Sequence, residues 1–167
     1  MPRSALLEEL KQRKPFRSPA EEATLSIART AAIIRRHLSA AVEPAGITLS
    51  QYNVLRILRG AGREGLPTLA VRDRLIEEAP GITRLVDKLE LAGYVVRDRP
   101  KSDRRQVICY VTPQGLALLK KLEVPVASAD EIGGGGLTVA EQRSLNLMLA
   151  RVRAAGRKKA PRTALAR

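Results

Sequence analysis

The segment from residue 80 to residue 112 constrains the fold most, because it places a short amphipathic helix directly before two strand-like runs. The helix is expected over 80–92 and ends at Gly93, the residue type that most easily adopts a left-handed helix cap. Residues 94–97 and 106–112 are rich in the β-branched and aromatic side chains that strands prefer. The charged turn between them predicts a β hairpin. This order favours a helix that enters a DNA groove beside a basic hairpin that contacts the flanking backbone.

The residues before this segment predict a helix-turn-helix. Thr48 and Gln51 have the spacing of a capping box, which opens a helix running to about residue 58. Leu66 is expected to form a minimal strand, and Thr68 to cap a short helix that ends near Ile76. The helix at 80–92 then follows after only a few residues, which is the spacing of a helix-turn-helix motif.

Helices with apolar stripes are expected on both sides of this middle segment. After a short helix over 4–11, Ser18, Pro19 and Glu21 give a strong start to a helix that reaches about residue 43. Its stripe consists of Ile27, Ala31, Ile34, Leu38 and Val42. A stripe of this kind must be buried against another element.

The C-terminal third predicts two more helices and a tail. One helix is expected over 113–132 with a kink at Pro125, and Gly133–Gly136 predict a flexible break. Thr138 and Glu141 then cap a helix over 139–155, and residues 157–167 are expected to be a frayed basic tail. Packing of the outer helices together, and against a second copy, would bury their stripes; a monomer with a larger private core is the alternative.

Charge and composition narrow the class of partner. Thirty Lys and Arg against 17 Asp and Glu give a net charge of +13 and a pI near 10.8, which favours nucleic acid or an anionic membrane surface. No apolar run approaches the ~20 residues of a membrane span. The N-terminus lacks a signal-peptide core, and the single cysteine fits a reducing compartment, so a cytoplasmic location is expected.

The same composition argues against catalysis and against single-strand binding. The chain has one His, one Cys and no phosphate-binding glycine loop. The usual combinations of catalytic, metal-binding or cofactor-binding residues therefore cannot be assembled from its motifs, and we expect neither an enzyme nor a cofactor. Single-strand and RNA modules stack bases on aromatic side chains, but aromatics are only 2% of this chain. Duplex DNA remains the expected partner.

The predicted helix over 80–92 turns a polar face outward. On a helical wheel Ile82, Leu85, Val86 and Leu89 share one arc, and the opposite side carries Pro80, Arg84, Asp87 and Leu91, flanked by Thr83 and Lys88. Arg84 is therefore a candidate to bind guanine O6 and N7, with a solvated surface arginine as the alternative. Asp87 would be repelled by DNA, so it is expected either to offset Arg84 or to hold an arginine of the hairpin. Pro80 and Gly81 keep the helix start small, where its amides suit either a phosphate oxygen or water.

The tip of the predicted hairpin is basic. Lys101, Arg104 and Arg105 surround Asp103, which is expected to orient them. Arginines on a narrow loop fit the minor groove of A·T-rich DNA, where the negative potential is focused. A charged tip that only aids solubility is the alternative, and the preceding helix favours the DNA role.

Residues 47–116 resemble the winged helix-turn-helix of the MarR (multiple antibiotic resistance regulator) family. The resemblance lies in ITLSQYNVLRIL, in PGITRLVDKLELAGYVVRD, and in SDRRQVICYVTPQG with its wing signature of Asp103, Arg105, Thr112 and Gly115. It extends to the flanking helices, although the four glycines at 133–136 depart from the family pattern. It implies an obligate homodimer with recognition helices in successive major grooves, wings in minor grooves, and usually repression. Arg84 and Arg105 would then be the recognition-helix and minor-groove arginines.

The resemblance also bears on regulation. Similar proteins often release DNA when a small, commonly aromatic or phenolic ligand binds between their dimerisation and DNA-binding parts, and others sense oxidants through cysteine. Here Cys109 is expected to be buried and inert, and His37 to be a surface or interface residue. The four aromatic residues, Phe16, Tyr52, Tyr94 and Tyr110, indicate no aromatic ligand cage, so effector residues stay unassigned.

The expected protein is mainly α with a small β hairpin, a single domain over 1–167. It comprises a winged helix-turn-helix core at 47–112, dimerisation helices at 19–46 and 113–156, and the tail at 157–167. The expected function is sequence-specific binding of a double-stranded operator by a homodimeric regulator, most often a repressor, that is either constitutive or released by a small-molecule effector. A non-specific architectural DNA-binding protein is the alternative.

Overall fold

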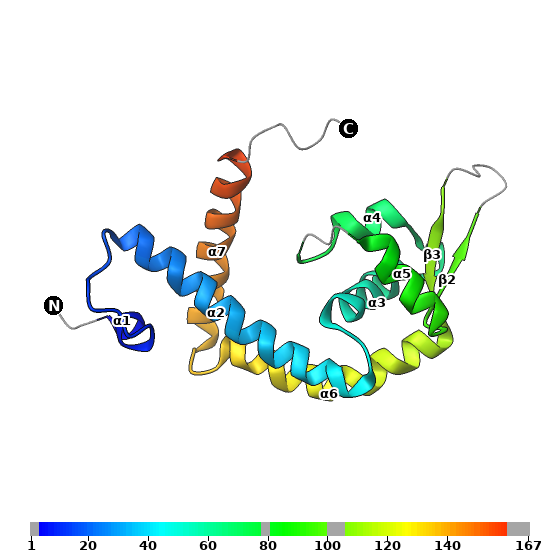
Figure 1. The fold of residues 1–167 in the computed structure, drawn as a ribbon, viewed down its shortest axis with the longest axis horizontal. Coiled ribbons are helices and arrows are strands. Elements are labelled where there is room, and N and C mark those ends of the chain that lie inside the picture. The colour runs from blue at the N-terminus through cyan, green and yellow to red at the C-terminus, as the bar shows by residue number, and fades with distance from the viewer. Residues whose placement is uncertain (1–3, 78–80, 100–105, 160–167) are drawn as a thin grey trace. The chain divides into compact units, whose positions relative to one another are not determined.

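A computed structural model describes residues 4–77, 81–99 and 106–159 (Figure 1). They fall into two compact units, one ending at Asp130 and the other starting at Glu131. The first unit begins with the helices α1 (Ala5–Glu9) and α2 (Pro19–Val42), the 3-10 turn η1 (Glu43–Ala45) and helix α3 (Leu49–Ala61). It continues with η2 (Gly62–Glu64), β1 (Leu66–Pro67), α4 (Thr68–Asp73), α5 (Ile82–Leu91), β2 (Val95–Asp98) and β3 (Ile108–Val111). Helix α6 (Pro113–Gly134) leads into the second unit, which contains α7 (Val139–Lys159).

The three short strands form one antiparallel sheet in the order β1-β3-β2. Leu66 pairs with Cys109 at one edge, and Val95 pairs with Val111 at the other. The predicted hairpin and the minimal strand at Leu66 are therefore both confirmed, and with them the mainly helical fold with a small sheet. Helix α5 lies directly before the hairpin and beside it (Figure 1).

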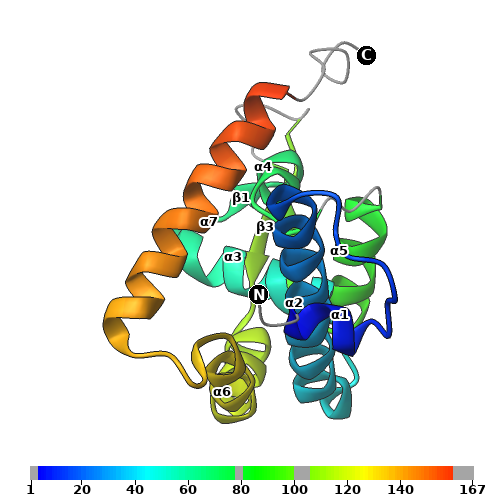
Figure 2. The same cartoon turned by 90° about the vertical axis from the view of Figure 1, so that its left-hand side faces the viewer.

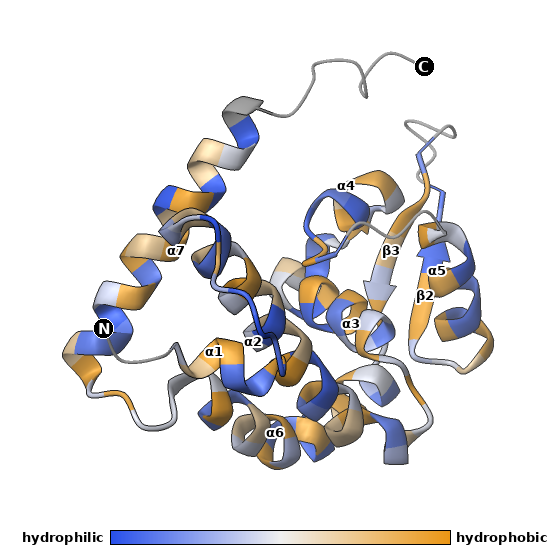
Figure 3. Ribbon diagram, turned by 60° about the vertical axis from the view of Figure 1, so that its left-hand side comes forward, coloured by the Kyte–Doolittle hydropathy of each residue, from blue (hydrophilic) through white to orange (hydrophobic). Residues whose placement is uncertain are grey.

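One apolar core holds the helix-turn-helix, the sheet and the flanking helices of the first unit together. Leu55 and Leu58 of α3 are fully buried, as are Val86 and Leu89 of α5. Apolar and polar residues alternate along α5 in Figure 3, as an amphipathic helix requires. The cluster also includes Val42, at the end of α2, together with Leu119, Leu122 and Val126 of α6. Figure 2 shows this end of α2 next to α6.

Local capping explains where most helices begin. The Ser18 hydroxyl accepts the Glu21 amide at 3.2 Å, which confirms the predicted start of α2. The Glu21 carboxylate, however, accepts the Arg17 amide rather than closing a box on Ser18. The capping boxes of Thr48 with Gln51 and of Thr138 with Glu141 are both complete.

Several predicted helix boundaries differ from the structure, including the end of α3, which lies at Ala61 instead of near residue 58. The short helix α4 ends at Asp73 instead of near Ile76, and Pro67 rather than Thr68 is its N-cap residue. Helix α6 continues across Pro125 into the glycine run and ends at Gly134, because Leu122, Val126 and Ala129 are buried on both sides of the proline. The break is thus shorter than 133–136, with the left-handed residue at Gly136. Helix α7 extends to Lys159, into the segment expected to be a tail.

The wing signature residues Thr112 and Gly115 join the hairpin to α6. The Thr112 hydroxyl donates to the Gly93 carbonyl at 2.7 Å and accepts the Gly115 amide at 3.1 Å, so it caps α6 and ties it to the turn after α5. A Cβ at Gly115 would collide with the Tyr94 carbonyl and would lie 2.9 Å from Val111 Cγ2. Only glycine permits this close approach of helix and strand. Within the described ranges, no helix combines the length and apolar character needed to cross a membrane.

Substitution of Gly115 tests this packing. Gly115→Ala should lower the free energy of unfolding by about 1–3 kcal/mol, because the added methyl group overpacks a backbone contact. Gly60→Ala is the matched control: a Cβ there meets nothing within 4 Å, and a helical alanine should raise stability by about 0.5–1 kcal/mol. Urea unfolding followed by circular dichroism measures both. Equal stability of the two variants would contradict the close approach.

Candidate nucleic-acid interface

Helix α5 presents the polar face that the sequence predicts. Ile82, Val86 and Leu89 are buried, and Leu85 is partly buried. On the other side Thr83, Arg84, Asp87 and Lys88 are exposed, and Leu91 is 92% exposed. Gly81 is the N-cap residue and makes no side-chain cap, while Pro80 lies outside the described residues. The outward face therefore offers two cations, a hydroxyl and one carboxylate to a partner.

Arg97 of β2 neutralises that carboxylate. Its Nη1 lies 2.7 Å from Asp87 Oδ1, and its Nε donates to Glu90 Oε2 at 2.9 Å. Its Nη2 also donates to Glu90, and its backbone amide donates to Glu90 Oε1 at 3.2 Å. Of the two roles expected for Asp87, contact with a hairpin arginine is thus the one observed. The three side chains form a cluster that ties the recognition helix to the first wing strand.

The pKa directions agree with this geometry. The hydrogen bond from the Arg97 guanidinium lowers the pKa of Glu90, and the same bond raises the pKa of Arg97. A carboxylate with a lowered folded-state pKa contributes stability above its unfolded pKa and loses it as the pH falls through the folded value. Both shifts favour the charged forms of Glu90 and Arg97.

The residues predicted at the wing tip, Lys101, Asp103, Arg104 and Arg105, lie outside the described residues. The base of the wing is described on both strands. Val96 pairs with Tyr110 and Asp98 pairs with Ile108, which fixes the register of the strands that lead to the tip.

Cys109 is buried, as predicted. Its Sγ lies 3.4 Å from the Thr68 hydroxyl, and burial raises the pKa of the thiol. A neutral, enclosed thiol is a poor nucleophile and a poor oxidant sensor. His37 is exposed on α2, and the described residues contain no cluster of His, Cys, Asp and Glu side chains suited to a metal ion.

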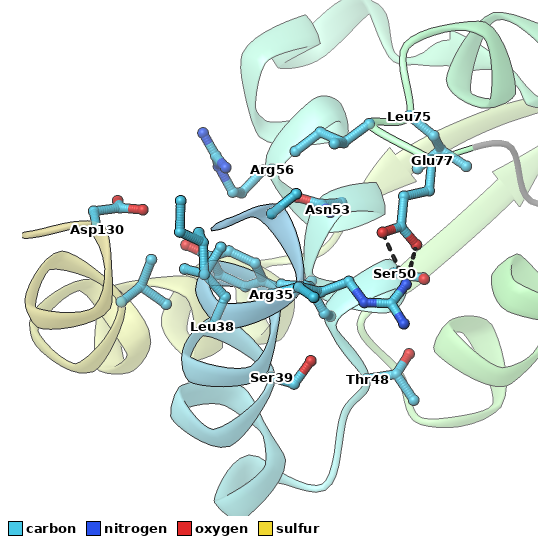
Figure 4. Close-up of a pocket in the computed structure, with 17 residues that line it drawn as sticks. Arg35, Leu38, Ser39, Thr48, Ser50, Asn53, Arg56, Leu75, Glu77 and Asp130 are labelled. Carbon is cyan, nitrogen blue, oxygen red and sulfur yellow. Dashed lines mark hydrogen bonds and ion pairs between the residues drawn. The ribbon is translucent and has the colours of Figure 1, made fainter. Parts of the chain in front are cut away.

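A second candidate site is a cavity of about 760 Å³ between α2, α3, α6 and the segment after α4. This volume is in the range of small-molecule sites. Its walls are largely apolar, and they include Ile34, Leu38, Leu49, Leu75 and Val126. Charged side chains also line it: Figure 4 shows Arg35 paired with Glu77, and it shows Arg56 and Asp130 as further lining residues. Tyr52 is also in the lining, and burial raises its pKa.

Sequence reasoning missed Arg97, Glu90 and this cavity. Asp87 and Glu90 stand three residues apart on one helix, where like charges repel. That repulsion, followed seven residues after Glu90 by an arginine in the next strand, was a usable signal for the cluster. The cavity gave no local signal, because its lining comes from four separated segments.

Comparison with known proteins adds three findings. Residues 47–107 match the MarR family. The chain is 32% identical over 121 residues to the HTH-type transcriptional repressor Rv2887 of Mycobacterium tuberculosis, covering 72% of this chain and 86% of that protein. It is 37% identical to a structurally known MarR transcription factor from Planctomyces limnophilus, with a TM-score of 0.63 over 81% of this chain and 98% of that one. CouR of Rhodococcus jostii RHA1, solved with p-coumaroyl-CoA, has a similar fold at 23% identity, with a TM-score of 0.69 over 82% and 95% of the two chains.

Loss of the Arg97 contacts should weaken DNA binding. Arg97→Met uncovers two carboxylates next to Arg84 and is expected to reduce duplex affinity about tenfold, within the range of coupled charge pairs. Arg72→Met, which breaks only the 3.1 Å pair with Asp73, is the control. Adding Asp87→Asn to Arg97→Met should restore part of the lost affinity in fluorescence anisotropy at fixed salt. No restoration would contradict the neutralising role.

Proposed function

Because this chain belongs to the MarR family of DNA-binding transcription regulators, we propose that it is a homodimeric repressor of sequence-specific, double-stranded operators. One observation carries the proposal: the exposed side chains of α5 form a cationic surface whose only described carboxylate on that face, Asp87, is held by Arg97. The net charge of +13 adds a long-range attraction to DNA that is independent of sequence.

Arg84 and its neighbours would read the major groove. Arg84 projects from the first half of α5, the part of a recognition helix that reaches base edges. Its guanidinium suits guanine, while Thr83 and Lys88 flank it and suit a base edge or a phosphate. The Gly81 amide and the amides of the first turn of α5 would donate to a phosphate oxygen, since no side chain caps this helix start. Pro80 has no N–H to donate and would only keep the entrance of the helix small.

The wing would contact the adjacent minor groove. In this proposal Lys101, Arg104 and Arg105 enter the groove at A·T pairs, and Asp103 orients them. What supports it is the fixed register of β2 and β3, the two strands between which these residues lie in the sequence, together with the anchoring of the strands at Thr112 and Arg97.

Exposed apolar side chains support the homodimer. In a single chain Leu25 and Ile27 of α2 are 37% and 38% exposed, so the predicted α2 stripe is buried only toward its C-terminal end. On α7 Leu147, Met148 and Val152 are all more than half exposed. A second copy brings the same helices and therefore a matching apolar face in a two-fold contact.

The cavity is the proposed effector site. It borders the segment that leads into α5, and it combines apolar walls with guanidinium groups. CouR, a protein of similar fold, was solved with p-coumaroyl-CoA. A small molecule in this cavity would release the operator; a repressor without an effector is the constitutive alternative.

Arg84→Ala tests base reading. It should weaken operator binding by about 1–3 kcal/mol and also reduce the preference for operator over random duplex. Lys120→Ala, which removes one exposed charge from α6, is the control. It should change the operator affinity and the preference for operator over random duplex by no more than a few tenths of a kcal/mol. Competition binding at fixed salt measures both, and the wild type should prefer its operator by at least ~10³-fold. If Arg84→Ala lowered the affinity for operator and for random duplex equally, base reading by Arg84 would be refuted. If the wild type itself bound operator and random duplex equally well, the result would favour a non-specific architectural protein.

The homodimer can be tested at α7. Met148→Asp combined with Val152→Asp places charges on the exposed stripe and should shift the protein to monomer in sedimentation velocity, with loss of operator binding. Asn146→Asp, an exposed position on the same helix, should leave the dimer intact. A wild type that sediments as a monomer at micromolar concentration would overturn the proposal.

A further inference from the structure

The positive charge of this chain is concentrated near its C-terminus. Residues 142–167 contain eight Lys and Arg and no Asp or Glu, so they supply eight of the 13 net positive charges. Helix α7 extends to Lys159 and therefore includes Arg157. Dense charge of one sign attracts polyanions. This segment belongs neither to the helix-turn-helix nor to the wing, so base reading by α5 leaves it without a role.

The arginines of α7 lie on the side of the helix opposite its apolar stripe. Polar and apolar residues alternate along α7 in Figure 3. The stripe consists of Leu145, Met148, Leu149 and Val152. At 100° per residue the opposite side carries four arginines and one leucine, which are Arg143, Leu147, Arg151, Arg153 and Arg157. All four arginines, the cationic face of α7, are exposed.

In the part of the chain that the structure describes, no ion pair neutralises the cationic face. The arginines that form ion pairs there are Arg17, Arg29, Arg35, Arg59, Arg72 and Arg97. Glu141 is the one acidic residue in the sequence of α7, and its carboxylate accepts the Thr138 amide at 2.7 Å. The four guanidinium groups are therefore available to an anionic partner.

Duplex DNA fits this face better than an anionic membrane does. A helix that lies on a membrane buries its apolar side in the lipid and commonly carries Trp or Phe there. Helix α7 has no aromatic residue, and its apolar stripe contacts a second copy in the proposed homodimer. With the stripe covered, the cationic face remains. A rise of about 1.5 Å per residue spreads Arg143 to Arg157 over about 21 Å, and guanidinium groups suit phosphate oxygens.

We propose that the cationic face of α7 is a second DNA-binding surface, which contacts phosphates of the duplex and does not read sequence. Phosphate contacts are the same on every duplex, so the face adds affinity and leaves the choice of operator to α5 and the wing. Each arginine bound to a phosphate releases counterions, which makes its contribution depend on salt. Coverage of the stripe rests on the proposed homodimer, whereas binding of random duplex by the cationic face requires no operator.

Neutralising three of these arginines tests the surface. In the full-length protein, Arg151→Gln, Arg153→Gln and Arg157→Gln together should weaken binding to operator and to random duplex by about tenfold each, with the preference between them unchanged. The plot of log Kd against log salt concentration should become shallower by about one unit for each arginine that contacts a phosphate. Fluorescence anisotropy over a series of salt concentrations measures both effects.

A matched control removes the same charge elsewhere. Arg36→Gln, Lys120→Gln and Lys121→Gln neutralise three exposed cations of α2 and α6. They should lower either affinity by less than about threefold, because only long-range attraction is lost. Replacing Arg151, Arg153 and Arg157 by lysine keeps the charge and should keep most of the affinity. Glutamine is a good helix former, so circular dichroism and sedimentation velocity should match the wild type in every variant.

Four results would overturn the second surface. The first is an equal loss of affinity in the glutamine variant and the control, because net charge alone would then explain it. The second is a loss on operator without a loss on random duplex. A changed sedimentation coefficient would place these arginines in the subunit contact. Loss of binding to phosphatidylserine vesicles, with the DNA affinity of the control, would make the partner a membrane.

The same measurements separate this proposal from the proposed function. If the wild type showed no preference for operator while the glutamine variant lost affinity for random duplex as described, sequence-specific regulation would be refuted. The second surface would then be supported.

Discussion

Burial of one face of α5 is the constraint on which the DNA-facing surface depends. Val86 and Leu89 are completely buried in the core that α3 and the sheet share. Removing either from that core would cost several kcal/mol, so the helix cannot rotate about its axis. Thr83, Arg84, Asp87 and Lys88 are consequently held outward. The same core positions Gly93 and Thr112, which fix where the wing begins.

Electrostatics then decide what this surface binds. An uncompensated carboxylate at Asp87 would oppose the phosphate backbone, but the Arg97 guanidinium lies 2.7 Å from it. Arg97 is itself positioned by β2, whose register is set by pairing with β3. In the proposed DNA complex the sheet would contribute twice, since its strands flank the wing tip in the sequence and Arg97 of β2 supplies the cation that neutralises Asp87 on the helix face.

Features encoded within a few residues could be predicted from the sequence, and features that join distant segments could not. The capping boxes at Thr48 and Thr138 involve residues three apart and were confirmed. The outward side of α5 followed from helical period alone. The predicted end of α6 was wrong because burial at Val126 and Ala129 outweighs the local tendency of proline and glycine to end a helix. The predicted end of α7 was wrong as well, because the helix continues to Lys159. The Arg35–Glu77 pair spans 42 residues, so only tertiary packing reveals it.

The ion pair between Arg35 and Glu77 shows how little an exposed contact can fix. Both side chains are more than half exposed, and ion pairs exposed to this degree contribute little to stability. Breaking a deeply buried, fully hydrogen-bonded pair would cost far more. The core under α5 differs from this pair, because Val86 and Leu89 are fully buried in it. The outward orientation of Arg84 is therefore set by the apolar core of α5 and not by ion pairs at the surface.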